Sequence, residues 1–171
     1  MHTLKTKKLV LTALFMTLTM VATMFIRIPL PLGYVNLGDA FVFLSVFILG
    51  PIYGTIAAGV GSALADLFGY IIYTPGTLII KTVVAFIAYL LYKILLKTTK
   101  KAFFAELVAG LVGSVVMAFG YFLYEILFFA TASVAIVNVP WNLLQGGVGV
   151  AISTVVMRIL SKTTILDKIR N

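Results

Sequence analysis

Residues 103–130, FFAELVAGLVGSVVMAFGYFLYEILFFA, decide the fold class of this chain. The only charged side chains in this segment are Glu106 and Glu125, near its two ends. A helix crosses the hydrocarbon core of a bilayer with roughly 20 consecutive, mostly apolar residues. The segment is therefore long and apolar enough to be a transmembrane helix, and the same test applies to the rest of the chain.

The composition shows that this segment is typical of the whole chain. Of the 171 residues, 62% are hydrophobic and 11% are charged, and the mean hydropathy is +1.16. A soluble domain is closer to half apolar and a quarter charged, so the surplus must face lipid. A soluble enzyme, a nucleic-acid-binding domain and a disordered tail are thereby excluded. Because the chain has no cysteine and a single histidine, His2, we expect no disulfide, no metal site and no cofactor.

Turn residues and charges divide the chain into six predicted spans. We place these at residues 9–26, 39–49, 53–68, 77–96, 103–130 and 139–160, with Asp39 as the N-cap of the second. The second and third spans are short, which predicts either a tight hairpin of tilted helices or a partly re-entrant segment. Residues 27–38 and 69–76 contain prolines and glycines and are predicted to be loops. The fold class is an all-α integral membrane bundle of six transmembrane helices, with one domain over residues 1–171.

The basic residues predict the orientation of the bundle. They form three clusters: before the first span, around the connection of the fourth and fifth, and after the sixth. Six spans put all three clusters on one side, which the positive-inside rule assigns to the cytoplasm together with both termini. The clusters are Lys5, Lys7 and Lys8; Lys93, Lys97, Lys100 and Lys101; and Arg158, Lys162, Lys168 and Arg170.

Most polar groups within or beside the spans converge on the outer half of the membrane. Ionisable groups in a bilayer are costly and mark a functional site by default. Glu106 is the exception, since a surface ion pair with Lys100 or Lys101 accounts for it. Aromatic walls with a few convergent polar groups are what a small-molecule site needs. The candidate substrate-binding residues are Tyr34, Asn36, Asp39, Asp66, Tyr73, Lys81, Tyr121, Glu125, Asn142 and Gln145.

Each of these residues also has a purely structural interpretation. Tyrosines at this level can anchor helices at the lipid headgroups. Asp66 and Lys81 can form an ion pair between the third and fourth spans, and the amides of the sixth span can join helices. The spacing of Tyr121, Tyr124 and Glu125 lets them share one helix face, which favours a pocket for these three.

Other patterns concern packing and partners. Small residues recur along the third, fifth and sixth spans, where they let helices approach closely. Ala13 and Thr17 form a similar face on the first span, which an intramembrane partner can use. The sequence has no GxxxxGK[ST] phosphate loop and no GxSxG or HExxH pattern. It also lacks the inverted repeat of a self-sufficient transporter, which indicates a binding subunit that needs another component.

Five motifs carry a resemblance to a known family. They are GYVNLGDA at 33–40, LGPIYG at 49–54, GSALAD at 61–66, PGTLIIK at 75–81 and PWNLLQ at 140–145. In this order and spacing they resemble the substrate-binding S components of energy-coupling factor (ECF) vitamin transporters. The resemblance covers nearly the whole chain. It is strongest to the riboflavin-transporter-like branch, which includes HmpT-type proteins assigned to hydroxymethylpyrimidine or pyridoxine.

The resemblance implies a mechanism and a set of partners. An S component binds a vitamin at the outer side, under a lid made by the loop between the first two spans. It docks on an EcfT-like membrane coupling subunit carried by two cytoplasmic ATPase subunits, and it topples in the membrane to release the vitamin. Family members dock through an Ala-x-x-x-Ala face, to which Ala13 and Thr17 correspond, with Thr in place of the second Ala. The chain is then a multi-pass protein of a bacterial cell membrane and not an enzyme.

The sequence leaves the substrate open. A pocket of Asp, Glu, Asn, Gln, Lys and Tyr suits a polar heteroaromatic, so we expect a pyridoxine- or hydroxymethylpyrimidine-like vitamin, with riboflavin as the alternative. Two other classes of function fit less of the sequence. One is an intramembrane enzyme that uses Glu125 and Asp66 as acid and base. The other is a small membrane channel or scaffold without a ligand.

Overall fold

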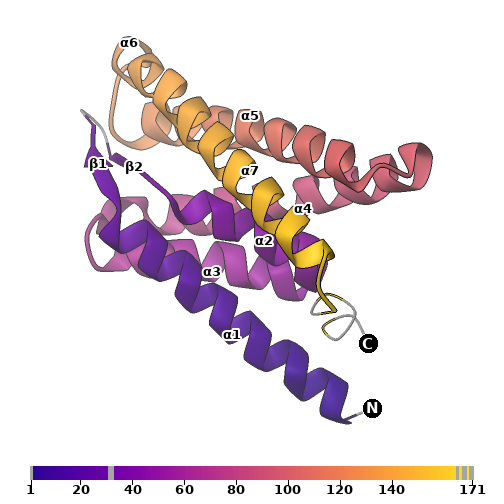
Figure 1. The fold of residues 1–171 in the computed structure, drawn as a ribbon. Helices are drawn as coiled ribbons and strands as arrows, with labels where there is room; N and C mark the ends of the chain where they lie inside the picture. The colour runs from indigo at the N-terminus through magenta and orange to yellow at the C-terminus, as the bar shows by residue number, and fades with distance from the viewer. Residues whose placement is uncertain (1, 31–32, 165, 167–168, 170–171) are drawn as a thin grey trace.

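The computed structural model describes residues 2–30, 33–164, 166 and 169, and most of them lie in helices (Figure 1). This is the all-α bundle that the sequence predicts. The elements in chain order are α1 (His2–Phe25), β1 (Arg27–Pro29), β2 (Tyr34–Asn36), α2 (Gly38–Leu49), α3 (Tyr53–Leu67), η1 (Ile71–Tyr73), α4 (Thr74–Thr99), α5 (Ala102–Phe128), α6 (Ala132–Ala135), η2 (Ile136–Asn138) and α7 (Val139–Ser161).

Every predicted span is a helix in the structure. Four helical segments of the described chain are long and apolar enough to cross a membrane: 5–25, 71–99, 102–128 and 132–161. The other two predicted spans correspond to α2, with 12 residues, and α3, with 15. The prediction that these two are short is confirmed.

The predicted loop at residues 69–76 is wrong in its second half. A turn of 3-10 helix, η1, is followed at once by α4, which begins at Thr74 and includes Pro75 in its first turn. Proline is tolerated there because the first helical N–H groups have no partner within the helix, and the ring already fixes a helical φ. Pro75 therefore starts a helix here instead of marking a loop.

Helix α2 lies at the centre of the bundle. It packs against α1, α3, α4 and α7, and all of its residues except Phe41 are buried. This environment explains a sequence that is apolar around the whole helix. On α7, a Cβ added to Gly149 would lie 2.7 Å from the Cβ of Asp39. Glycine thus lets α7 approach the start of α2 closely.

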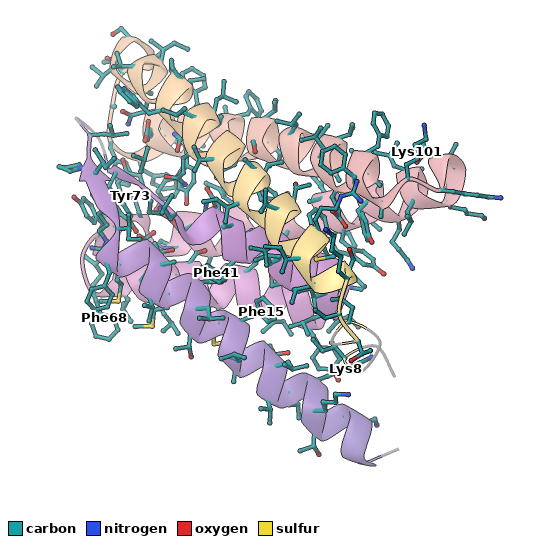
Figure 2. All side chains as sticks on the ribbon, in the orientation of Figure 1. Lys8, Phe15, Phe41, Phe68, Tyr73 and Lys101 are labelled. Atoms are coloured by element: carbon teal, nitrogen blue, oxygen red, sulfur yellow. The ribbon has the colours of Figure 1, made fainter. Side chains whose placement is uncertain are left out.

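The two ends of the bundle differ in character. The start of α1 and the end of α7 lie at the same end of the molecule (Figure 1). Lys8 and Lys101 also lie toward this end, and Phe68 and Tyr73 lie toward the opposite one (Figure 2). This arrangement is the one that the positive-inside prediction requires. Lys168 and Arg170, two members of the third basic cluster, lie outside the described residues.

Glu106 does not lie where the sequence analysis puts it. Its side chain is only 4% exposed, on the face of α5 that also buries Ala105 and Ala109. The predicted place of Glu106 at the surface is therefore wrong. A position in the second turn of a helix was taken to be at the membrane surface, but the inward face of α5 already begins there.

Candidate functional site

A short hairpin leads from α1 to α2 on one side of the site. Strands β1 and β2 are antiparallel, with Arg27 opposite Asn36 and Pro29 opposite Tyr34. Gly33 has a φ of +73°, a left-handed conformation that favours glycine, and a Cβ there would lie 3.4 Å from the Tyr73 ring. The segment is not helical, as predicted. The strand pairing was not predicted, because three-residue strands are too short to show an alternating pattern.

Arg27 ties this hairpin to two helices. Its Nε donates to the carbonyl oxygen of Thr23 at 3.0 Å, and a terminal nitrogen donates to that of Ala65 at 2.9 Å. The guanidinium also lies over the Tyr34 ring, 4.7 Å from the ring centroid. Arg27 therefore joins the end of α1, the end of α3 and strand β2.

Tyr34 connects the hairpin to Asp66 at the end of α3. Its hydroxyl donates to Oδ1 of Asp66, and its ring lies 4.5 Å from the Tyr70 ring, centroid to centroid. Burial and the adjacent Asp66 carboxylate raise the pKa of Tyr34 well above its usual value. The phenol thus keeps its proton and acts as a donor to Asp66.

A buried ion pair joins Asp39 of α2 to Lys81 of α4. The side chains are 1% and 3% exposed, and the Lys81 ammonium also lies 2.9 Å from the sulfur of Met117. The alternative of an Asp66–Lys81 ion pair is wrong, since the acid that pairs with Lys81 is Asp39. A buried charge needs a close opposite charge, and the start of α2 lies nearer to Lys81 than the sequence reveals.

Asp39 is also not the N-cap of α2. The helix begins one residue earlier, with Leu37 as its N-cap, and no side chain caps it. One Asp39 oxygen binds Lys81, and the other accepts a hydrogen bond from Nε2 of Gln145 at 2.5 Å. With both oxygens engaged by side chains of other helices, the carboxylate does not turn back toward the first backbone N–H groups of α2.

Gln145 links this ion pair to the hairpin. Its Oε1 accepts the backbone N–H of Asn36 at 2.8 Å, while its Nε2 donates to Asp39. The Asn36 side chain in turn accepts the N–H of Gly38 at 2.8 Å. A continuous chain of hydrogen bonds therefore runs from strand β2 through Gln145 and Asp39 to Lys81.

Glu125 of α5 is buried on the other side of the site, with 2% of its side chain exposed. Its Oε1 accepts hydrogen bonds from the Tyr73 hydroxyl at 3.3 Å and from Nδ2 of Asn138 at 3.0 Å. Its Oε2 has no hydrogen-bond partner among the residues that the structure describes. One oxygen of this carboxyl group is thus fully used and the other is available.

The tyrosines that precede Glu125 on α5 point in different directions. The Tyr121 hydroxyl lies 3.0 Å from that of Thr77, inside the site. The Tyr124 hydroxyl donates to the carbonyl oxygen of Ile72 at 2.7 Å, and its ring lines a separate apolar groove. The shared face predicted for these three residues is therefore wrong for Tyr124. Residues three apart on a helix differ by about 60° in direction, which is enough to leave one outside.

These side chains meet in one pocket at the hairpin end of the bundle. The free volume of this cavity is about 30 Å³, room for one or two water molecules. Asp39 is the one predicted residue that does not line it, because it lies behind Lys81 and Gln145. The predicted residues that do line it are Tyr34, Asn36, Asp66, Tyr73, Lys81, Tyr121, Glu125, Asn142 and Gln145.

The sequence analysis missed several residues of the site. Thr23, Leu30 and Gly33 line it because of the hairpin geometry, which the sequence did not predict. Three polar residues did have a visible signal, since each lies four positions before a candidate and so shares its helix face. These are Ser62 before Asp66, Thr77 before Lys81, and Asn138 before Asn142; the first two line the pocket and Asn138 binds Glu125.

The predicted docking residues lie on a different surface. Ala13 and Thr17 are both exposed on α1. The Thr17 hydroxyl donates to the carbonyl oxygen of Ala13 at 2.9 Å, so this polar group is satisfied within the helix. This exposed face therefore consists of small side chains, and its one hydroxyl group already has a hydrogen-bond partner.

A bundle of apolar helices that encloses a small polar, aromatic pocket is the arrangement of a membrane-embedded protein with ionisable groups inside it. The family model described as "ECF-type riboflavin transporter, S component" matches residues 3–162. The chain belongs to this family and is a multi-pass cell membrane protein. The particular branch of the family is not distinguished by this match.

One relative is similar to part of the chain. An uncharacterized protein from Pyrococcus woesei is 49% identical to it over 63 residues, which is 36% of this chain and 43% of that protein. The chain thus spans less than half the length of this relative.

Proposed function

We propose that this chain is the substrate-binding subunit of an ECF-type ABC transporter, which captures a water-soluble vitamin at the outer face of the membrane for ATP-driven uptake. The observation that carries the proposal is the convergence of side chains from β2, α3, α4, α5 and α7 on one enclosed pocket. Carboxyl groups, amides and tyrosine rings in such a space can hold a flat polar ring by its edges and faces. The substrate-binding roles are assigned to the predicted residues that line it, with Asp39 orienting Lys81 and Gln145.

The proposed substrate is a pyridoxine- or hydroxymethylpyrimidine-like vitamin. A single six-membered ring is larger than a cavity of about 30 Å³, so the pocket must widen to admit it, but by less than three fused rings require. The Asn142 amide makes no hydrogen bond to another described side chain and lines the pocket beside Gln145, so it is available to the edge of such a ring. Tyr73 and Tyr121 supply aromatic surface on the opposite wall.

Riboflavin is the second candidate, and the description of the matching family favours it. Its three fused rings are larger, so its binding demands a wider opening of the hairpin. The two candidates therefore differ in how far β1 and β2 must move from the enclosed state.

The proposed partners are an EcfT-like membrane coupling subunit and two cytoplasmic ATPase subunits. Family membership and the exposed Ala13 and Thr17 face support this assignment. ATP is hydrolysed on the separate subunits, so this chain contributes binding and no catalysis.

A thermal-shift screen of the purified protein in detergent tests the proposal. The panel contains pyridoxine, hydroxymethylpyrimidine, riboflavin and the other B vitamins. A ligand at 100 times its Kd should raise the free energy of unfolding by about 2.7 kcal/mol. We expect one ring class to stabilise the protein. If no compound in the panel stabilises the protein, the proposal is contradicted and a channel or scaffold without a ligand is favoured.

A further inference from the structure

The charges around the pocket are unevenly distributed. Lys81 is the one cation among the described residues that line it, and it is neutralised by Asp39. Two carboxyl groups, those of Asp66 and Glu125, line the same space from α3 and α5. Arg27, in the adjoining hairpin, is engaged by two backbone carbonyls and a tyrosine ring. The lining therefore offers acceptors and negative charge and no uncommitted cation.

Glu125 offers the sharpest feature in this lining. Its side chain is 98% buried, and its Oε2 has no hydrogen-bond partner among the described residues, whereas Oε1 accepts two hydrogen bonds. Buried acceptors are nearly always paired in proteins. Because Glu125 lines the pocket, a group bound there is placed to complete Oε2.

We propose that the site selects a heteroaromatic ring whose amino group donates a hydrogen bond to Oε2 of Glu125, and that it rejects the phosphorylated form of the same compound. This inference rests on the proposed function and narrows its substrate class. It assigns Glu125 as a specificity-determining residue. The Asn142 amide, in contrast, can form hydrogen bonds with the edge of any polar ring.

The rejection of phosphate follows from electrostatics. A phosphate monoester carries a charge of roughly −1.5 to −2 at neutral pH. In an enclosed pocket, such a group needs a cation or several donors, and burying it unpaired is strongly unfavourable. Here it would meet Asp66 and Glu125, and taking Lys81 from Asp39 would leave that buried carboxylate without its counter-charge. We expect phosphorylation to weaken binding by about a hundredfold or more.

Matched ligand pairs test the inference on the wild-type protein. The first pair is pyridoxamine and pyridoxine, which differ by an amino group in place of a hydroxyl. The second is hydroxymethylpyrimidine and its phosphate monoester, and the third is riboflavin and flavin mononucleotide. Affinities are measured by calorimetry in detergent. We expect the amino-bearing rings to bind more tightly than pyridoxine, and each phosphate to bind far more weakly than its parent.

A variant pair locates the selectivity. Glu125→Gln keeps the size of the side chain and its bonds to Tyr73 and Asn138, but it removes the carboxylate. It should reduce the affinity for the amino-bearing ring about tenfold or more. Glu106→Gln makes the same change on the same helix, outside the pocket, and should leave the affinity unchanged. Thermal unfolding confirms that each variant is folded.

The outcomes separate this inference from the proposed function. Tight binding of a phosphate, tight binding of riboflavin alone, or an amino preference that survives Glu125→Gln overturns the inference and leaves the vitamin-binding function standing. Failure of every compound to bind contradicts the proposed function, and the inference with it.

Discussion

Glu125 and Asn142 are the two side chains of the pocket with the clearest capacity for new hydrogen bonds. One has an unused carboxylate oxygen, and the other lines the cavity without a hydrogen bond to another described side chain. Replacing either by alanine should weaken vitamin binding more than tenfold, or about 1.4 kcal/mol or more. The measurement is a calorimetric titration with the vitamin that the thermal-shift screen identifies.

Tyr124→Phe is the control for these two variants. Tyr124 is next to Glu125 in sequence, yet its hydroxyl binds the carbonyl oxygen of Ile72 outside the pocket. The change should leave affinity unaltered. If both alanine variants bind as tightly as the wild type, the candidate site is not where the vitamin binds.

The polar side chains of the site could be found from the sequence, but their partners could not. A charge within an apolar span is conspicuous whatever it contacts, so Asp66, Lys81 and Glu125 were all predicted. The pairing of Lys81 with Asp39 depends on the position of α2 relative to α4. Helix packing fixes that position through many small contacts, and no local pattern in the sequence records it.

The glycines of α7 offer a comparison within one helix. A Cβ on Gly149 would lie 2.7 Å from the Cβ of Asp39, whereas one on Gly147 would have no atom within 4 Å. Gly149→Ala should force α7 away from α2 and destabilise the protein by about 1–3 kcal/mol. Gly147→Ala should be neutral or stabilising by up to about 1 kcal/mol, because alanine favours the helix.

Thermal unfolding in detergent distinguishes these two variants. The comparison removes the effect of helix propensity, since both changes are the same substitution in the same helix. Equal stability of the two variants would mean that α2 and α7 are not in close contact at Gly149.

Helix α1 should carry the partner surface. Ala13→Leu places a bulky side chain on its exposed small-residue face, so transport in the assembled complex should be lost while vitamin binding by the isolated chain is unchanged. The measurements are vitamin uptake into proteoliposomes and calorimetry. Val115→Leu, at an exposed position of α5, is the control, and uptake that survives Ala13→Leu would place the docking surface elsewhere.

The helices were more predictable than their connections. Long apolar segments give a strong signal, and α5 and α7 end within two residues of the predicted positions. The turn η1 and the early start of α4 escaped prediction, because Pro75 can either break a helix or begin one. The β1–β2 pairing escaped because it depends on residues from both sides of a turn.

The bundle as a whole should have its pocket outside and its basic clusters inside the cell. The natural sequence has no cysteine, so a single introduced cysteine reports one position. Ile28→Cys, in the exposed hairpin strand β1, should react with a membrane-impermeant maleimide in intact cells. Lys97→Cys, exposed near the end of α4, should react only after permeabilisation. The reverse pattern would invert the orientation.

The anchored hairpin should also control how fast a ligand enters and leaves the pocket. Asn36 is held by Gln145, and Arg27 by Ala65. On the proposed function, we expect a vitamin to pass only while these bonds are broken. The same opening of the hairpin should limit both the association and the dissociation of the ligand. A variant that weakens these hydrogen bonds should therefore increase both rates. We then expect a captured molecule to have a long residence time, which depends on opening of the hairpin more than on the contacts of the molecule itself. Such a delay would give the proposed coupling subunit time to meet a protein that has its ligand bound.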